Sequence, residues 1–468
     1  MKRLFTLIIV SVALATGVQA QDETINETPL SLEAVENGTV VTLTNNNSAV
    51  VKFALRTYVS PTEYYDDVWY TVQNTNTINL NAGDILVLRS TCKDYGNNFK
   101  IHASKDVYVY GNPLSLIAQT EYKTMTDLSD CADGVLQGLF DKGWNGNPCI
   151  KNHPTKDIVL PATTLKNSCY YGMFKGCTSL TRAPQLPATT MAFRCYSHMF
   201  SYCTSLTVAP ELPATTLADE CYYGMFESCS VLKDAPALPA MTLTYACYDN
   251  MLRGCTSMTQ APELPATSLA IDCYYGMFWE CTSLENAPAL PATTLAPNCY
   301  NNMFYMCSSL VNAPELPATT LSENCYASMF YGCSSLEKAP VLPAPTLVKS
   351  CYSYMFTNCT KLNYVKCLAT DLSANDAAND WERGTNEWLF GVAATGTFVK
   401  ADGVDTWTTG DSGIPTGWTT EEASTGIGSI DNGRQTTDNR WYTLDGRMLQ
   451  GEPMQKGVYI YNGKKVKK

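Results

Sequence analysis

The stretch from Leu160 to Gln185 reads LPATTLKNSCYYGMFKGCTSLTRAPQ and is the first of eight copies of one pattern. Each copy has 26 residues, and the copies follow one another from Leu160 to Cys367 without an insertion or a deletion. A constant repeat length is typical of chains whose copies stack as coils, because an added residue in the buried path would shift every later coil. The repeat therefore predicts a solenoid of eight coils, none of which can bury its apolar side alone.

Within a copy, constant and variable positions separate an inner face from an outer face. The spacing from Cys169 to Leu180 is close to helical and predicts a short helix or 3₁₀ turn, too short to be stable by itself. Residues 178–185 predict one strand per coil, which pairs with its equivalents above and below. We expect the variable residues to face water. The positions that stay apolar or cysteine in almost every copy, and that we expect inside, are Leu160, Leu165, Cys169, Met173, Phe174, Cys177 and Leu180.

The run from Met173 to Leu180, MFKGCTSL, carries a family resemblance. It resembles the AF-x-G-C-x-x-L motif of BspA-type leucine-rich repeats, with Cys169 where that family usually has isoleucine and an added proline near Pro184. These departures suggest a cysteine- and proline-rich subgroup. The resemblance implies a leucine-rich-repeat-like fold and a role in cell-surface adhesion or in binding host proteins. The predicted fold class is thus a β-rich α/β solenoid, leucine-rich-repeat-like, with eight 26-residue coils and a small antiparallel β domain before it.

Sixteen of the 20 cysteines belong to the repeat, two in each copy and eight residues apart. Disulfides within a coil, such as Cys169 to Cys177, would explain the even number and the presence of both cysteines in every copy. Two alternatives remain open: buried free thiols that pack as small apolar groups, and disulfides between neighbouring coils, whose separation of about 4.8 Å suits the bond. Metal binding is disfavoured, because one coil does not supply four ligands. The disulfide candidates are Cys169, Cys177, Cys195, Cys203, Cys221, Cys229, Cys247, Cys255, Cys273, Cys281, Cys299, Cys307, Cys325, Cys333, Cys351 and Cys359.

Candidate binding residues occupy variable positions of the repeat. The position two residues before the second cysteine carries three successive aromatic residues, Trp279, Tyr305 and Tyr331. If the copies stack, these residues form an exposed strip that receives sugar rings face-on or anchors a protein partner. The alternative is that they only cover neighbouring coils. A second, weaker strip consists of Tyr171, Tyr223 and Tyr275, with Ser197 and Asp249 between them.

The flanks differ from the repeat in composition. A basic start, an apolar run and the small residues Val18 and Ala20 predict a signal peptide. After it, period-two alternation predicts an antiparallel, sandwich-like β domain. The end of the chain combines a linker composition with a tail that is similar to the C-terminal sorting domains of exported proteins from the Gram-negative bacteria in which BspA-type repeats occur. The predicted division is 1–20 signal peptide, 22–116 N-terminal β domain, 117–159 N-terminal cap, 160–372 solenoid, 373–422 C-terminal cap, and 423–468 linker and sorting-domain-like tail.

Composition limits the function. The formal net charge of −12 argues against nucleic acid as a partner. With three histidines and no catalytic fingerprint, we predict no enzyme, no catalytic residue, no cofactor and no metal. The first hypothesis is an exported protein at the cell surface, associated with the outer membrane, that binds a host or bacterial surface protein; the alternative is glycan binding for a carbohydrate uptake system. No membrane-spanning segment is predicted once the signal peptide is removed.

Overall fold

The computed structural model describes residues 28–46, 49–60, 63–64, 68–143, 146–423, 441–442, 448–449, 453, 458–461 and 464–467. The predicted signal peptide, residues 1–20, lies outside the described residues. The chain divides into two compact units, Met1–Glu422 and Ala423–Lys468. The first unit holds the repeat and the segments predicted as β domain and caps, and the second holds the predicted linker and tail.

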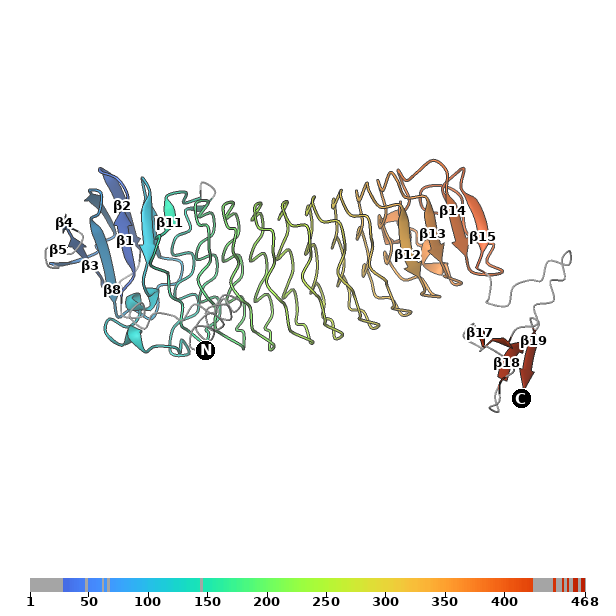
Figure 1. The fold of residues 1–468 in the computed structure, drawn as a ribbon, viewed down its shortest axis with the longest axis horizontal. Coiled ribbons are helices and arrows are strands. Elements are labelled where there is room, and N and C mark those ends of the chain that lie inside the picture. Colours follow the sequence, from blue (N-terminus) through green and yellow to red (C-terminus); the bar gives the residue numbers. More distant parts are fainter. Residues whose placement is uncertain are drawn as a thin grey trace, which may run out of the picture. The chain divides into compact units, whose positions relative to one another are not determined.

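The first unit begins with two sheets (Figure 1). One has six strands in the order β11-β10-β1-β8-β3-β6, and the other has three in the order β7-β2-β9. Neighbouring strands are antiparallel except for β10 and β11. Buried and half-buried residues alternate along β2 as the period of two requires. The bounds are β1 Ser31–Ala34, β2 Thr39–Asn45, β3 Val51–Arg56, β4 Tyr58–Ser60, β5 Glu63–Tyr64, β6 Trp69–Thr71, β7 Thr75–Leu80, β8 Ile85–Ser90, β9 Phe99–Ala103, β10 Val107–Tyr110 and β11 Ile150–Asn152.

Of the two alternatives predicted between Cys169 and Leu180, the helix does not form, and the described residues contain no α-helix. The 3₁₀-type turn does occur, since amides such as that of Met173 donate to the carbonyl three residues before. A chain of such turns takes the place of the helix. Ser168, Gly172 and Gly176 have φ of +53°, +55° and +72°, and the seven later copies repeat positive φ at the equivalent positions. Such a left-handed residue ends a helical turn, so a new turn begins every four residues. The spacing that suggested a helix is therefore a period of four.

The amides of this turn segment divide their hydrogen bonds between the coil and its neighbour. The Met173 amide donates to the Tyr170 carbonyl within the coil, over 3.1 Å. The next amide, of Phe174, donates to the Met199 carbonyl of the following copy, over 3.0 Å. This alternation continues from copy to copy, so residues about 26 apart are joined along the whole repeat. A helix would satisfy its amides internally; here the adjacent coil satisfies half of them.

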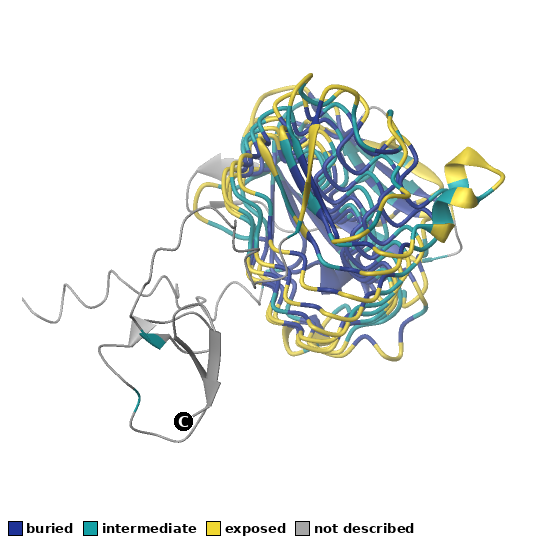
Figure 2. Ribbon diagram, turned by 90° about the vertical axis from the view of Figure 1, so that its right-hand side faces the viewer, coloured by how far each residue is buried: buried dark blue, intermediate teal, exposed yellow. Residues whose placement is uncertain are grey.

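The core consists of identical side chains stacked across copies. Figure 2 shows the buried residues on the inner side of the coils and exposed residues around the rim. The tyrosines equivalent to Tyr170 are fully buried and stack at 5.8 to 6.0 Å between ring centroids. The phenylalanines equivalent to Phe174 stack at 5.3 to 5.8 Å, with Leu252 in place of one ring. Trp388 is fully buried and stacks on Tyr352, which closes the tyrosine column at its C-terminal end. Each ring pair adds about 0.5–1.5 kcal/mol beyond area burial.

The strand predicted in every coil forms only near the C-terminal end of the repeat. Elsewhere the copies meet at isolated parallel bridges, such as the pairs Arg182 and Val208 or Gln260 and Asn286. The reason is proline: Pro184 and Pro187 lie on this path, and prolines at the equivalent positions of nearly every later copy remove amide donors that a ladder requires. β13 has no proline, and it pairs on both sides in the parallel sheet β12-β13-β14-β15. The bounds are β12 Lys338–Leu342, β13 Tyr364–Cys367, β14 Thr397–Lys400 and β15 Thr419–Glu422.

Short 3₁₀ helices flank the repeat, and a small sheet forms the second unit. In that unit the strands are antiparallel in the order β17-β16-β18-β19. No helix within the described ranges is long and apolar enough to cross a membrane. The bounds are η2 Pro113–Leu116, η3 Glu121–Lys123, η5 Ser373–Asp376, η6 Asp380–Glu382, β16 Trp441–Tyr442, β17 Met448–Leu449, β18 Val458–Tyr461 and β19 Lys464–Lys467.

Candidate functional site

The chain of turns leaves one outward side chain in every four residues. In the first copy, Tyr170 and Phe174 are buried, whereas Tyr171 and Lys175 are half-buried at the surface. We call the surface formed by the equivalents of these two outward positions the turn face. Because each coil bonds to the next with constant spacing, equivalent side chains stand in columns along it.

Trp279, Tyr305 and Tyr331 meet in one such column, which we call the aromatic column. The ring centroids of Trp279 and Tyr305 are 4.6 Å apart, with 42° between the ring planes. Those of Tyr305 and Tyr331 are 4.5 Å apart and nearly parallel, at 7°. All three side chains are half-buried. The structure therefore brings together the three residues of the first predicted strip.

The orientation of these rings decides what they can contact. Both faces of Tyr305 are covered, one by Trp279 and one by Tyr331. The guanidinium carbon of Arg253 lies 4.3 Å from the Trp279 ring centre, so an arginine also stacks on the tryptophan. For Tyr305 this leaves the ring edge and the hydroxyl group to contact a partner, whereas the Tyr331 hydroxyl accepts a hydrogen bond from Asn358 over 3.2 Å. A sugar that requires an open ring face finds none on Tyr305, whereas protein side chains pack against edges.

The column continues in the other direction with charged residues. Arg253 lies 3.9 Å from the Glu227 carboxylate, and the Ser201 hydroxyl donates to the same carboxylate over 3.3 Å. His198 Nδ1 lies 3.6 Å from Glu227, but burial, followed by the nearby cations, lowers the pKa of His198 to about 4. The histidine is therefore neutral near pH 7. At the position of Lys175, the turn face is thus mainly charged in its first half and mainly aromatic in its second.

The members of the second predicted strip, Tyr171, Tyr223 and Tyr275, are separated from one another by residues of the intervening copies. They belong to alternate copies, and His198 stands between the first two, with its ring 5.8 Å from Tyr171 and 5.0 Å from Tyr223, both edge-on. The hydroxyl of Tyr275 accepts a hydrogen bond from Asn302, over 2.9 Å. These tyrosines pair with polar residues of the neighbouring coils.

Sequence reasoning missed why each of these tyrosines precedes a glycine. A Cβ on Gly224 would lie 2.6 Å from His198 Nδ1, and a Cβ on Gly276 would lie 2.6 Å from Asn250 Oδ1. The glycine makes room for the polar side chain of the preceding copy. The pattern that reveals this is the alternation of Tyr-Gly with Ser-His, Asp-Asn and Asn-Asn at the same position of successive copies.

None of the 20 cysteines forms a disulfide in the structure; all are free thiols. This departs from our first interpretation, disulfides within a coil, and corresponds to the alternative of buried thiols. The second cysteine of a copy points to a backbone oxygen of the preceding coil: the Cys203 thiol donates to the Phe174 carbonyl over 3.1 Å, and the equivalent bond recurs up to Cys359. Burial raises the pKa of these thiols, as for Cys203, well above the ordinary value, and it raises the pKa of Cys195, a first cysteine of its copy, to about 12. A thiol that stays protonated is a poor nucleophile and a poor metal ligand.

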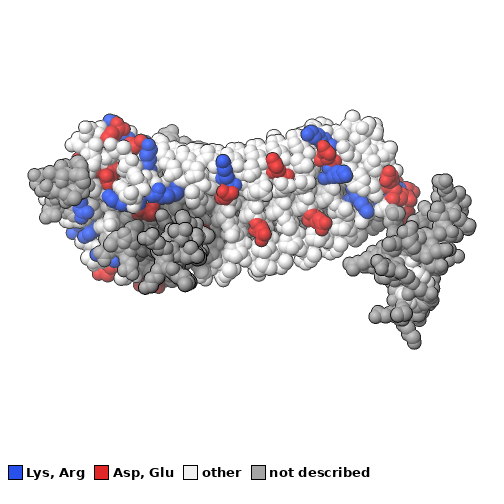
Figure 3. All heavy atoms as spheres, in the orientation of Figure 1, with Lys and Arg blue, Asp and Glu red and all other residues white. Residues whose placement is uncertain are grey.

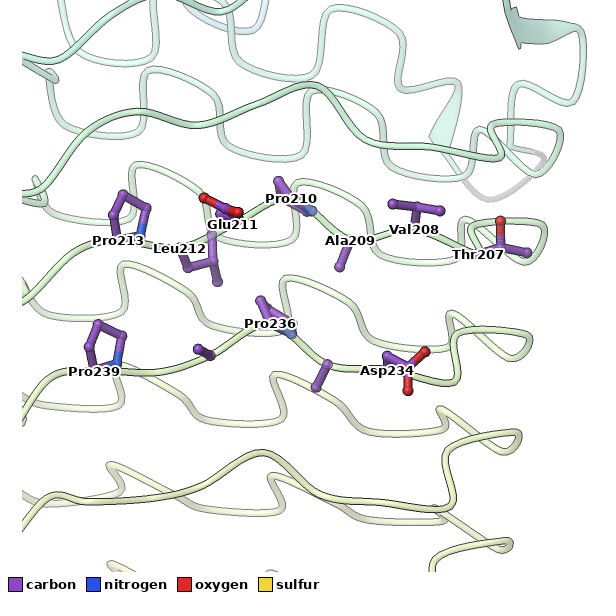
Figure 4. A pocket seen from close by; sticks show the side chains of 12 residues that line it. Thr207, Val208, Ala209, Pro210, Glu211, Leu212, Pro213, Asp234, Pro236 and Pro239 are labelled. Carbon is purple, nitrogen blue, oxygen red and sulfur yellow. The ribbon is translucent and has the colours of Figure 1, made fainter. Parts of the chain in front are cut away.

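Outside the turn face, possible metal ligands and one surface groove are the remaining candidates for a site. Within the described ranges, no group of three or more His, Cys, Asp or Glu side chains is arranged to hold a metal ion. A groove of about 480 Å³ lies between the proline-rich runs 207–213 and 234–239 (Figure 4). It is lined by four prolines and by apolar side chains, with Glu211 and Asp234 as its charged residues. It lacks the converging polar groups that mark a small-molecule site.

Comparison with known proteins identifies the repeat. A family model described as the BspA type leucine-rich repeat region matches six copies over residues 245–376. The repeat region is therefore a leucine-rich repeat of the BspA type. No curated protein and no solved structure matches this chain. Proteins with this repeat are typically surface repeat proteins that act in binding.

Proposed function

We propose that this protein is an exported cell-surface module whose eight repeats form a solenoid that binds a protein partner through the turn face. The observation that carries the proposal is the aromatic column, a stack of half-buried rings fixed by neighbouring coils. Rigid aromatic side chains lose little conformational entropy on binding and are enriched among the residues that dominate binding energy. Within the described parts of the chain, the inner positions of the repeat are buried, so contact falls to the outer ones.

A protein partner suits this surface better than a glycan. Figure 3 shows one face of the molecule on which charged side chains are sparse over the middle of the repeat. Besides the column, the repeat exposes Ile271 at 46% and Met306 at 43%. Apolar side chains of this kind supply the dry centre of a protein interface. The covered faces of Tyr305 argue against face-on sugar stacking at the centre of the column.

The test is binding by a variant in which Trp279, Tyr305 and Tyr331 are all changed to alanine. The matched control changes Phe193, Tyr202 and Tyr245 to alanine; these aromatic residues are 40 to 46% exposed but lie outside the column. We expect the column variant to lose capture of host or bacterial surface proteins by at least about tenfold, since anchor residues contribute about 2 kcal/mol or more, and the control to retain it.

Two outcomes decide between the hypotheses. Equal capture by the column variant and the wild type would reject the aromatic column as the contact surface. If free glycans compete with capture by the wild type, and if the wild type but not the column variant binds a glycan array, the carbohydrate hypothesis is supported instead. Circular dichroism of both variants checks that the coils remain folded.

We also propose that the chain is exported, reaches the outer membrane surface, and is delivered there by its tail. The support is the predicted signal peptide, residues 1–20, and the likeness of residues 423–468 to sorting domains, now seen as a compact unit of its own. Deleting 423–468 should leave the protein in the periplasm, whereas the full chain is accessible to surface proteolysis. Surface exposure of the deleted form would reject the sorting role.

A further inference from the structure

Asp249 is a buried carboxyl in the middle of the turn face. It occupies the position that carries tyrosine in the copies on either side, Tyr223 and Tyr275. Only 9% of its surface is exposed. Asn250 donates to Asp249 Oδ1 over 2.6 Å. Within the described ranges no cation lies within ion-pair distance of Asp249.

The charges around Asp249 leave an excess of carboxylates. Arg194 is taken by Glu220, at 2.6 Å, and Arg253 lies between Glu227, at 3.9 Å, and the ring of Trp279. Asp272 of the next coil also has no ion pair in the described part of the chain, and it opposes the ionisation of Asp249. The titratable and charged groups that face or adjoin Asp249 are Glu220, Glu227, Asp272, Arg194, Arg253, His198, Tyr223, Tyr245 and Tyr275.

We propose that Asp249, between Tyr223 and Tyr275, binds the ammonium or guanidinium group of a lysine or arginine side chain on the protein partner. This inference rests on the proposed function and names the chemistry of the partner. A carboxylate supplies the counter-charge, and two phenol rings add cation–π attraction. Tyr275 lies four residues before Trp279 on the same coil, so a partner that reaches the aromatic column brings its neighbouring side chains to Asp249.

The state of Asp249 predicts a distinctive dependence on pH. Burial, followed by the charge of Asp272, raises the pKa of the Asp249 carboxyl to about 8, so it carries a proton at pH 7. A bound cation favours the ionised form and expels that proton. Affinity for a cation should therefore rise with pH, by up to about tenfold per unit below pH 8, and level off above it. A site made only of ordinary surface carboxylates would show no change over this range.

The experiment titrates the full chain with two peptides, acetyl-Gly-Lys-Gly-amide and its norleucine analogue, while the Tyr223 and Tyr275 ring signals are followed by NMR. We expect the lysine peptide to shift both rings, its affinity to rise at least about fivefold from pH 6.5 to 8, and the norleucine peptide to have no effect. Asp249→Asn, which keeps the shape of the side chain, should abolish the response. Asn301→Ala, in the same column two copies later, is the control and should not.

Each outcome separates this inference from the proposed function. Equal shifts by both peptides, a response that survives in Asp249→Asn, or an affinity independent of pH would overturn the cation site. If the alanine variant of the aromatic column still captures the protein partner while the lysine peptide binds, the cation site stands and the column proposal falls. If capture needs the column but the lysine peptide does not bind, only the cation site is rejected.

Discussion

The phenylalanine column offers a direct test of how the coils stack. Phe140, which precedes the repeat, and the seven buried phenylalanines of the copies form a column in which neighbouring rings stack at 5.3 to 5.8 Å, and Leu252 interrupts it in the fourth copy. If equal coils impose equal surroundings, Leu252→Phe should place a ring between Phe226 and Phe278. Two new ring contacts at about 0.5–1.5 kcal/mol each predict a gain of about 1–3 kcal/mol.

One neighbour decides whether that gain appears. Met258 is fully buried and stands where every other copy has leucine. If Met258 fills the space that Leu252 leaves, the single variant will be overpacked, which destabilises by about 1–3 kcal/mol and cancels the gain. Adding Met258→Leu removes the added length. We therefore expect Leu252→Phe to stabilise the chain in the Met258→Leu background and to be close to neutral alone.

Urea unfolding followed by circular dichroism and by tyrosine fluorescence measures the effect, and agreement between the two signals checks that the repeat unfolds as one unit. The four chains of the cycle give the coupling between positions 252 and 258. Destabilisation by Leu252→Phe in both backgrounds would refute the reasoning. It would show that the fourth coil has its own shape and that equal length does not impose equal surroundings.

Three further outcomes follow from the structure. Burial raises the pKa of thiols such as Cys195 and Cys247 to about 12 from the ordinary 9.0. The contribution of each buried thiol to the free energy of unfolding is therefore complete below pH 9 and is lost as pH rises toward 12, by up to about 1.4 kcal/mol per pH unit. Urea midpoints measured against pH test this, and thiol labelling at pH 8 should reach the repeat cysteines only after unfolding. Gly224→Ala should destabilise by about 1–2 kcal/mol through its positive φ and further through its contact with His198, and His198→Ser should relieve the second part alone in a double-mutant cycle. The wild type should lose stability as pH rises from 4 to 8, because the raised pKa of Asp249 makes ionisation of its buried carboxyl unfavourable in the folded chain. Asp249→Asn should reduce this loss, and an unchanged pH profile would contradict the prediction.

The sequence alone predicts which residues of a coil are inside. Leu160, Met173, Phe174 and Leu180 are all buried, as their constancy across copies indicated. The helix failed because a period of four and a period of 3.6 cannot be told apart over two turns. The two periods differ in the positive φ found at every fourth residue. The sequence does not reveal it, because most of these positions carry residues other than glycine. The buried Tyr170 column escaped prediction because tyrosine is common at surfaces too.

The strand and the aromatic strip show a second limit. The positions of the prolines argue against a strand in every coil, since each proline lacks the amide donor that a strand pairing requires. The equivalent segment without proline, β13, does form a paired strand. For Trp279, Tyr305 and Tyr331, spacing predicted contact, and the structure confirms that they meet. Spacing carries no information on whether rings meet by face or by edge, because that depends on side-chain torsions set by the neighbouring coils. The same torsions decide between a sugar site and a protein site.

The coil spacing therefore acts on function as well as on the fold. Aromatic residues in consecutive copies are held close enough to stack on one another, so a ring between two others, such as Tyr305, has both faces covered within the protein. Residues in alternate copies, such as Tyr223 and Tyr275, are held too far apart to stack, and the position between them is left to a shorter side chain. The carboxyl at that position, Asp249, is only 9% exposed, and it has no ion pair among the residues that the structure describes. Alternation of long and short side chains along a column thus allows a stack of equal coils to form a specific site. In this chain the short side chain at such a position is the carboxyl of Asp249.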